Sequence, residues 1–232
     1  MHLDVVETVP EMARAMTEGT VDLYMDSAFP VLKACRLSGA RPVLLWKKHG
    51  VETHASVFFA RRGAGPSSIG ALRNHSLVLS ATTSTSGFLL PVAFLRARGI
   101  AVADPEEMGT PGSVRVLLSG DAENTVFWVL EGRGDAGAVS NEYFDRLAGI
   151  RAGELAVLAT TPAVPRALVC VRADLGAERQ RNVVTFLSSL GETPEGRRRL
   201  EEFQKTGGFG HIPETELGTA EHLLDVLERG AP

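Results

Sequence analysis

The stretch "SATTSTSGFLL", Ser80 to Leu90, carries six hydroxyl side chains among its first seven residues. An apolar run typical of a strand, 77–79, leads into it, and an apolar run typical of a helix, 88–95, follows it. The first N–H groups of a helix have no partner inside the helix, and the helix dipole adds positive character there. The stretch therefore predicts a strand that turns into a helix whose start binds an anion.

Four residues form the predicted anion site: Ser84, Thr85, Ser86 and Gly87. Hydroxyls donate hydrogen bonds to an oxyanion without adding charge, and a glycine lets a ligand come close to the backbone. The alternative is that Ser84 or Ser86 only caps the helix. The neighbouring "GAGPSSIG", 63–70, lacks the Gly-Lys-Ser/Thr ending of a nucleotide-binding loop, and the Gly-x-Ser-x-Gly spacing of a nucleophile elbow is missing.

The composition is that of an ordinary globular protein. The chain has 232 residues, 44% of them apolar and 22% charged, which suits one large domain or two small lobes. The net charge of −4, without a basic stripe, argues against a nucleic-acid partner. The longest uncharged run, 76–95, has the length of a membrane span, but its seven Ser/Thr residues, Gly87 and Pro91 indicate strand, turn and helix instead.

Strands and helices alternate along the chain, which predicts an α/β fold. The expected strands include "VDLYM", "ASVFFARR", "SLVLS" and "ALVCVRA". Gly/Pro-rich crossings near 62–68 and 161–165 divide the chain into a split lobe one, 1–63 and 163–232, and an inserted lobe two, 64–162. Two connections between two lobes make a hinge, and such an arrangement usually places a ligand in the cleft.

Other polar residues give weaker signals. Asp26 and Ser27 follow the strand "VDLYM", where ligands of open α/β sheets bind, although either residue could instead cap the next helix. The six histidines show no i, i+4 pairing, so no metal site is expected, and nothing indicates a cofactor. No acid/base pair is recognisable by spacing, so we do not expect an enzyme. Cys35 and Cys170 are interpreted as two buried thiols, and one disulfide is possible if the chain is exported.

These pieces in this order resemble the PhnD family, the phosphonate-, phosphite- and phosphate-binding proteins of bacterial ABC importers. The resemblance runs from about Leu3 to Pro213 and is most specific at "STSGFLLP", Ser84 to Pro91. Supporting segments are "VDLYMDS", "ASVFFARR", "VPRALVCVR" and "ETPEGRRRLEEF". The resemblance implies the type II periplasmic-binding fold, in which two α/β lobes close on an oxyanion by a hinge. It also implies a periplasmic location, a membrane permease as partner and no catalysis.

The resemblance implies roles for several residues. Ser84, Thr85 and Ser86 would hold the phosphorus oxygens. Asp26 stands where many members have an aromatic hydroxyl, with Tyr24 two residues earlier, and it would have to meet a protonated ligand oxygen or be neutralised. His54 stands where members have a tyrosine and could still donate to the anion.

Two further positions bear on the choice of ligand. Glu142 matches a carboxylate that aminoalkyl-phosphonate binders use against the ligand amine, and Arg166 aligns with a second acidic position in that role. An arginine there could pair with Glu142 or contact the anion in bidentate fashion. Either arrangement disfavours an aminophosphonate, so we expect a small oxyanion or an unaminated phosphonate.

Family members begin with a strand and helix before the counterpart of "LDVVET", whereas here Met1 falls almost on that segment. We therefore expect lobe one to lack its first strand and helix, and the signal segment of an exported protein to be absent from this sequence. The alternative functions are a ligand-sensing module of a signalling protein and, with less support, an enzyme on the same fold.

Overall fold

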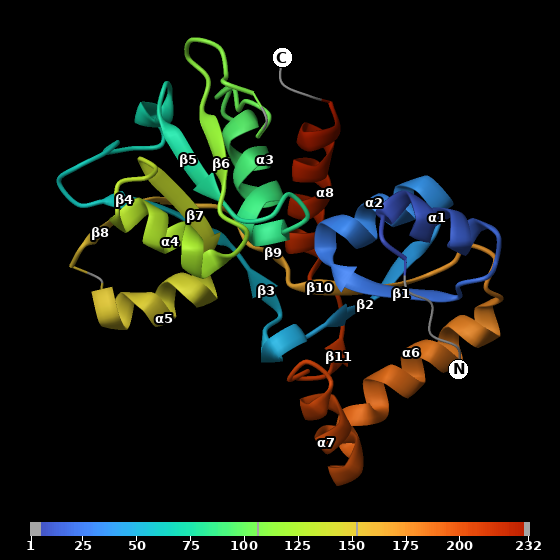
Figure 1. The fold of residues 1–232 in the computed structure, drawn as a ribbon. Helices are drawn as coiled ribbons and strands as arrows, with labels where there is room; N and C mark the ends of the chain where they lie inside the picture. The colour runs from blue at the N-terminus through green and yellow to red at the C-terminus, as the bar shows by residue number, and fades with distance from the viewer. Residues whose placement is uncertain (1–5, 106, 152, 230–232) are drawn as a thin grey trace. The chain divides into compact units, whose positions relative to one another are not determined.

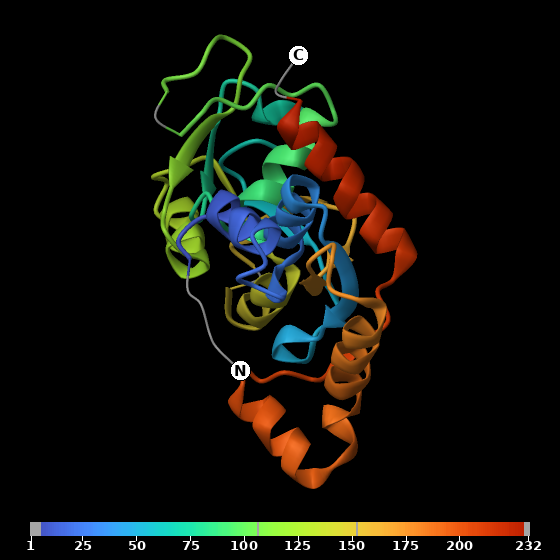
Figure 2. The same ribbon diagram turned by 90° about the vertical axis from the view of Figure 1, so that its right-hand side faces the viewer.

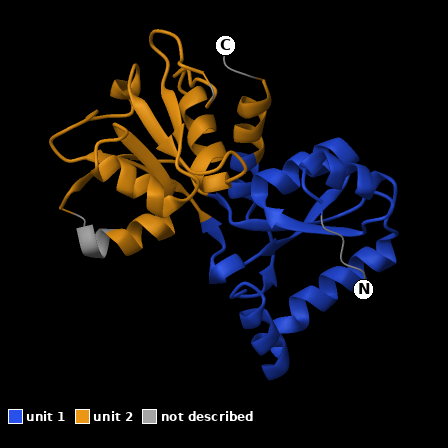
Figure 3. Cartoon of the chain, viewed as in Figure 1, with its two compact units in different colours: residues 1–53, 164–220 blue, residues 54–163, 221–232 orange. Residues whose placement is uncertain are grey.

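The structure is a computed structural model that describes residues 6–105, 107–151 and 153–229. The chain forms two compact units: unit 1 comprises residues 1–53 and 164–220, and unit 2 comprises residues 54–163 and 221–232 (Figure 3). Compared with the predicted lobes, residues 54–63 and 221–232 group with unit 2. The reason is that 56–61 form a strand of the sheet of unit 2, and the end of the last helix packs on its core.

Unit 2 contains a five-stranded sheet in the order β6-β5-β7-β4-β8. Its central strands run parallel, β5 with β6 and β7, whereas β4 runs antiparallel to β7 and β8 (Figure 1). The continuous apolar run of β5 is buried on both faces of the sheet, as expected for a parallel strand. The strands are β4 (Ser56–Arg61), β5 (Ser76–Leu79), β6 (Arg115–Leu118), β7 (Ala136–Ser140) and β8 (Leu155–Thr160).

Helices cover both faces of this sheet. One face packs against α3 (Leu90–Arg96), through side chains such as Val92 and Leu95. The other face packs against α4 (Ala122–Leu130) and α5 (Asn141–Arg151). One π-helical turn, η3 (Thr85–Leu89), leads directly into α3, and a short 3-10 turn, η2 (Gly70–Leu72), precedes β5. The strand, turn and helix predicted around Ser80–Leu90 are therefore present.

Unit 1 contains a four-stranded sheet in the order β1-β10-β2-β11, and its pairings are all antiparallel. The strands are β1 (Leu23–Ser27), β2 (Arg41–Trp46), β10 (Ala167–Val171) and β11 (Phe209–Gly210). Every residue of β10 is buried, whereas every residue of β1 is half-buried. The helices are α1 (Val9–Thr17), α2 (Ala28–Ser38), α6 (Ala177–Ser189) and α7 (Pro194–Glu202), with 3-10 turns η1 (Lys48–Gly50) and η4 (Leu190–Glu192).

Local sequence signals explain where these helices begin and end. Thr8 and Glu11 form a capping box at the start of α1, and Pro10 occupies its first turn. Gly39 ends α2 in the left-handed conformation, with φ of 74°, which glycine adopts without strain. The strand expected from "LDVVET", 3–8, lies half outside the described residues, and its described half, 6–8, leads into α1 without forming a strand.

Two features near the ends of the units were not predicted. Short strands β3 (Thr53–His54) and β9 (Val164–Pro165) pair where the chain passes from one unit to the other. The last helix, α8 (Glu214–Glu228), begins in unit 1 and ends in unit 2. Its final turns lie along α3, where Leu227 packs on the core and accepts a hydrogen bond from Arg96 (Figure 2).

Candidate functional site

The hydroxyl-rich stretch forms a tight turn at the end of β5. Ser84 is the N-cap of the π-helical turn η3, because its side-chain oxygen accepts a hydrogen bond from the N–H of Gly87 at 3.1 Å. Ser84 therefore caps the helix start, which the sequence analysis gave as the alternative to anion binding. Thr82 and Thr83, earlier in the turn, are exposed, so only part of the hydroxyl run faces the helix start.

Thr85 is the exceptional residue of this turn. Its side chain is only 4% exposed, and its hydroxyl oxygen has no hydrogen-bond partner in the described part of the chain. Leaving a buried hydroxyl without a partner costs about 1–3 kcal/mol, so native structures rarely tolerate it without a reason. Thr85 is the first residue of η3, where helix N–H groups also lack internal partners. The Thr85 hydroxyl is therefore a hydrogen-bond donor at the start of η3, a position that suits an oxyanion.

Two further serines fix the turn in place. The hydroxyl of Ser56, on β4, donates to the carbonyl of Ser86 at 2.7 Å. The N–H of Ser80 donates to the carbonyl of Gly87 at 2.9 Å. Both bonds use carbonyl groups as acceptors, which leaves the N–H side of the turn facing away from them. Ser56 and Ser80 thus fix the carbonyl groups of the helix start to the sheet and its end.

A second set of predicted residues lies in unit 1, at the end of β1. The Tyr24 hydroxyl donates to one carboxylate oxygen of Asp26 at 2.9 Å, and the N–H of Ser27 donates to the other at 2.6 Å. Burial raises the pKa of Tyr24, and the negative charge of Asp26 raises it further. The side chain of Ser27, the N-cap residue of α2, makes no capping hydrogen bond.

One cation, Lys48, lies close to this carboxylate and to a second cation, Arg166. Burial lowers the pKa of Lys48, and the charge of Arg166 lowers it further, whereas Asp26 acts in the opposite direction. The Lys48 amine also lies 5.1 Å from the ring centre of Trp46, and the backbone N–H of Arg166 donates to the carbonyl of Glu52 at 2.8 Å. Two positive charges and one negative charge give this part of unit 1 a net positive character.

Lys48 was not among the predicted site residues. It follows the end of β2, on the 3-10 turn η1, next to a second lysine that has a different role. Lys47 pairs with Glu52 at 2.6 Å, between the amine nitrogen and a carboxylate oxygen. The available signal was a Lys-Lys pair at the end of the predicted strand "RPVLLWKK", which does not by itself say which lysine faces the site.

The remaining predicted residues belong to unit 2. His54 ends β3 and is 1% exposed. Glu142 lies in the first turn of α5 and is half-buried. The predicted residues thus form two sets: Ser84, Thr85, Ser86, Gly87, His54 and Glu142 in unit 2, and Tyr24, Asp26, Ser27 and Arg166 in unit 1. A pairing of Arg166 with Glu142 stays a prediction.

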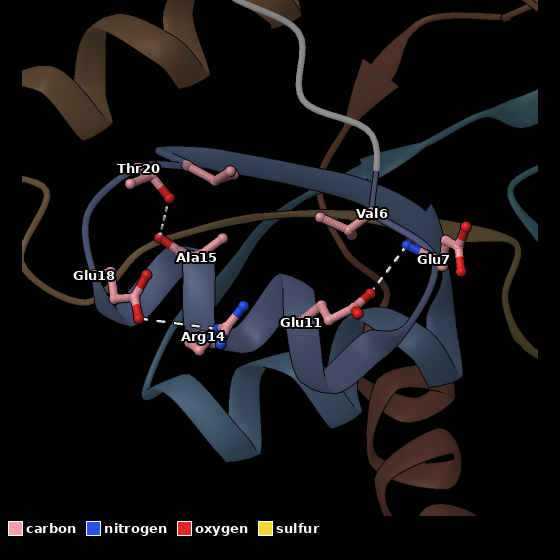
Figure 4. Close-up of a pocket in the computed structure, with 8 residues that line it drawn as sticks. Val6, Glu7, Glu11, Arg14, Ala15, Glu18 and Thr20 are labelled. Carbon is pink, nitrogen blue, oxygen red and sulfur yellow. Dashed lines mark hydrogen bonds and ion pairs between the residues drawn. The ribbon is translucent and has the colours of Figure 1, made fainter.

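One cavity lies within unit 1, and none of the predicted site residues lines it (Figure 4). It has a volume of about 430 Å³ and is lined by residues of α1 and of the segments that flank it. Three of the lining side chains, Glu7, Glu11 and Glu18, are acidic, and the single basic one, Arg14, lies 3.9 Å from Glu18. This excess of negative charge makes the cavity unsuitable for an oxyanion.

The described residues contain neither of two other kinds of feature, a metal-binding cluster or a membrane-spanning helix. Among residues 6–105, 107–151 and 153–229, no three His, Cys, Asp or Glu side chains cluster as metal ligands would. Within the same ranges, no helix is both long and apolar enough to span a membrane.

Sequence comparison identifies the family. The family described as "ABC transporter, phosphonate, periplasmic substrate-binding protein" matches residues 1–216. The chain belongs to this phosphonate-binding family. The resemblance stated from "STSGFLLP" and its supporting segments is therefore confirmed. Members of the family are periplasmic substrate-binding components of ABC transporters and not enzymes. No match was found among curated protein sequences.

Solved structures agree with the predicted fold. XAC2383 from Xanthomonas citri, described as bound to ATP, has 25% identity and a TM-score of 0.85, over 98% of this chain and 85% of that one. PhnD1 from Prochlorococcus marinus, described in complex with methylphosphonate, has 18% identity and a TM-score of 0.65, over 97% and 85%. The ABC phosphonate transporter component PA3383 from Pseudomonas aeruginosa has 17% identity and a TM-score of 0.61, over 93% and 71%. The type II periplasmic-binding fold is thereby confirmed.

Proposed function

We propose that this phosphonate-binding family member captures a small phosphorus oxyanion, such as a phosphonate, phosphite or phosphate, and delivers it to a membrane permease. The single observation that carries the proposal is the buried hydroxyl of Thr85 at the start of a helix, which has no hydrogen-bond partner among the described residues. A ligand oxygen would give that hydroxyl the hydrogen bond it lacks, and the first N–H groups of the helix would add further donors.

In this proposal, capture occurs by hinge closure. Unit 2 supplies neutral donors from 84–87, and unit 1 supplies Lys48 and Arg166. The chain passes between the units through β3 and β9, and such paired connections suit a hinge. Ligand binding would shift the population toward a closed state that both sets of residues contact.

The charges of unit 1 favour a doubly charged ligand without an amine. Lys48 and Arg166 together carry two positive charges, and the Asp26 carboxylate already accepts hydrogen bonds from Tyr24 and Ser27. Asp26 is therefore stabilised without a protonated ligand oxygen. A ligand amine would meet two cations, which disfavours an aminophosphonate.

A second candidate is a ligand with a phosphate chain. The structure most similar in TM-score among those named above, XAC2383, is described as bound to ATP, and it shares 25% identity with this chain. The same helix start and the same cations would suit a terminal phosphate group. The two candidates differ in ligand size, not in the chemistry of recognition.

The test is thermal unfolding of the purified protein against a ligand panel. The panel contains phosphate, phosphite, methylphosphonate, 2-aminoethylphosphonate, ATP, sulfate and arginine. A ligand at about 100 times its dissociation constant adds about 2.7 kcal/mol, which is roughly 5–10 °C for a chain of this size. We expect that shift with at least one of phosphate, phosphite and methylphosphonate. We expect no shift with arginine or 2-aminoethylphosphonate.

Two matched variants make the test specific. Thr85→Val keeps the shape of the side chain and removes the hydroxyl, whereas Thr82→Val removes an exposed hydroxyl of the same turn. We expect the ligand-induced shift to fall to about half or less in Thr85→Val, as a 10-fold or larger loss of affinity requires, and to persist in Thr82→Val. Equal shifts in both variants, or no shift of the wild-type protein with any phosphorus compound, would contradict the proposal. A shift with ATP but not with the small anions would select the second candidate.

A further inference from the structure

The two cysteines of the chain lie buried in the same unit. Cys35 is on α2 and is 8% exposed, and Cys170 is on β10 and is 0% exposed. Both are free thiols in the structure. No part of the anion-binding proposal uses them, although both positions belong to the core of unit 1. The question is whether their placement has a chemical purpose.

The alternation of side chains along β10 directs Cys170 toward α2. Ala167 and Val169 pack in a cluster with Val184 and Leu187 of α6, so they point to the α6 face of the sheet. Successive side chains of a strand point to opposite faces, which places Cys170 on the other face. That face is covered by α2, which packs against β10 and carries Cys35.

Strand β10 is regular at this position. The register between β10 and β2 shifts between Val169 and Cys170, but the extra residue, Val43, belongs to β2, because Val169 lies opposite Leu44 and Cys170 opposite Pro42. On its other side, β10 pairs with β1 without a register shift. The alternation of side chains along β10 therefore holds through Cys170.

Each thiol shifts the pKa of the other. The interaction with Cys170 lowers the pKa of Cys35, although burial acts in the opposite direction, whereas the interaction with Cys35 and burial both raise the pKa of Cys170. Cys35 is therefore the thiol of the pair that loses its proton more readily, and it is also the less deeply buried of the two. A thiolate is the nucleophile in thiol–disulfide exchange, so the more reactive sulfur is also the more accessible one.

We propose that Cys35 and Cys170 form a disulfide bond in the exported protein. The Cys35 thiolate attacks an external disulfide and releases one of its thiols. The Cys170 thiol then loses its proton and attacks the Cys35 sulfur of the mixed disulfide, which releases the second thiol. Two cysteine thiols are oxidised and one external disulfide is reduced to two thiols. The proposal rests on the proposed function for its periplasmic location, where such oxidants operate.

The position of the bond in the chain has a consequence for the two units. The loop it closes, 36–169, contains the whole inserted segment 54–163 of unit 2, whereas both sulfurs belong to unit 1. The bond therefore restricts the unfolded chain over a long loop and ties α2 to β10 within one unit. It adds no covalent link between unit 1 and unit 2, so hinge closure remains free.

The experiment is refolding of the full chain in a buffer of reduced and oxidised glutathione. The product is denatured, treated with N-ethylmaleimide and weighed by mass spectrometry. We expect a monomer that takes up no maleimide and is lighter than the reduced chain by two hydrogen atoms. Because the sequence has two cysteines, an intramolecular disulfide can join only Cys35 and Cys170. Two maleimide labels, or a disulfide-linked dimer, would overturn the proposal.

A second measurement compares thermal unfolding with and without reductant. We expect the oxidised protein to unfold at least about 5 °C above the reduced protein, because long-loop disulfides typically add a few kcal/mol. The double variant Cys35→Ala/Cys170→Ala should show no dependence on reductant. An oxidised protein that unfolds at a lower temperature would overturn the proposal. Phosphate binding by the reduced protein, measured by calorimetry, reports on the proposed function independently.

Discussion

Ser80 and Gly87 lie so close together that a Cβ atom at position 87 would be 2.5 Å from the Ser80 hydroxyl oxygen. The same atom would be 2.9 Å from the Ser84 hydroxyl oxygen. The backbone at Gly87 does not have a positive φ, so glycine is required here by space and not by conformation. The turn 84–87, where we propose that the anion binds, is therefore built around a contact that admits no side chain.

Gly87→Ala should disturb both the fold and ligand binding. Overpacking of this kind costs about 1–3 kcal/mol, and any shift of Ser84 disrupts the cap of η3. The matched control is Gly218→Ala on the exposed face of α8, where no atom lies within 4 Å of the added Cβ. The control should gain about 0.5–1 kcal/mol, since alanine is the better helix former. Urea unfolding measures both values, and equal effects would show that the close contact at Gly87 relaxes freely.

Thr85→Val should separate stability from binding. The substitution removes a buried hydroxyl without a hydrogen-bond partner, so the ligand-free protein should gain about 1 kcal/mol. Phosphate or phosphonate affinity should fall by about 10-fold or more at the same time, since a bond to a charged ligand is worth about 1.5–3 kcal/mol. Thr85→Ser keeps the hydroxyl and should retain binding. A loss of stability in Thr85→Val would mean that the hydroxyl serves the fold instead.

Lys48→Met should also raise stability and weaken anion binding. The pKa of Lys48 is lowered by burial and by Arg166, so the folded state binds the lysine proton less tightly than the unfolded state. The stability cost of that charge is therefore present at neutral pH and disappears as the pH rises through the lysine range. Lys48→Met removes this stability cost. It also removes one of the two cations that we propose to contact the ligand. Lys47→Met, which breaks only the pair with Glu52, is the control and should leave calorimetric affinity unchanged.

Asp135 should contribute to stability in a pH-dependent manner. Partial burial alone would raise the pKa of Asp135, but the Ser76 N–H at 2.8 Å, the Ser76 hydroxyl at 2.7 Å and His75 at 3.4 Å together lower it. A carboxyl group whose pKa is lowered on folding contributes its full stabilisation above its unfolded-state pKa of about 4. That stabilisation is lost as the pH falls through the folded-state pKa. Asp135→Asn should therefore be less stable than wild type at pH 7, and the difference should shrink toward pH 3.

Urea unfolding from pH 3 to pH 7 measures that difference. Glu178→Gln, on α6, controls for the removal of one negative charge from an exposed site. If the difference between Asp135→Asn and wild type stays constant over this range, the hydrogen bonds from Ser76 do not favour the ionised form.

Thr206→Val should destabilise unit 1 through Trp46. The Trp46 indole N–H donates to the Thr206 hydroxyl at 2.9 Å in a buried environment, and the indole stacks on Phe203 with ring centres 5.4 Å apart. Valine would leave the indole N–H buried without an acceptor, at a cost of about 1–3 kcal/mol. Thr206→Ser retains the acceptor and should lose less. Tryptophan fluorescence during urea unfolding reports the change, and equal losses in the two variants would assign the effect to packing.

Much of this architecture could be predicted from the sequence. The apolar run of β5, the hydroxyl turn and the helix after it are encoded locally, and so are the caps at Thr8 and Gly39. The helix α8 was missed, although Leu217, Ala220, Leu224 and Leu227 have the spacing of one helical face. That signal was present in the sequence and was not used.

The details of the site could not be predicted in the same way. The sequence shows three consecutive hydroxyls, but only the turn geometry assigns Ser84 to the cap and leaves Thr85 without a partner. Lys48 could not be singled out from Lys47, since its character depends on Arg166, which lies far away in the chain. Local patterns specify elements, whereas the charges around a side chain depend on long-range pairing.

The sheet of unit 1 also sets an order of events during synthesis. Strand β10 is the pairing partner of both β1 and β2, and it lies beyond the whole inserted segment of unit 2. At about 5–20 residues per second, the ribosome needs roughly 6–25 s to go from the end of β2 to the end of β10. During that interval β1 and β2 have no strand between them, and unpaired strands are prone to aggregate. The strands of unit 2 can pair as soon as they emerge, so the sheet of unit 1, whose first strands are encoded first, is completed after the sheet of unit 2.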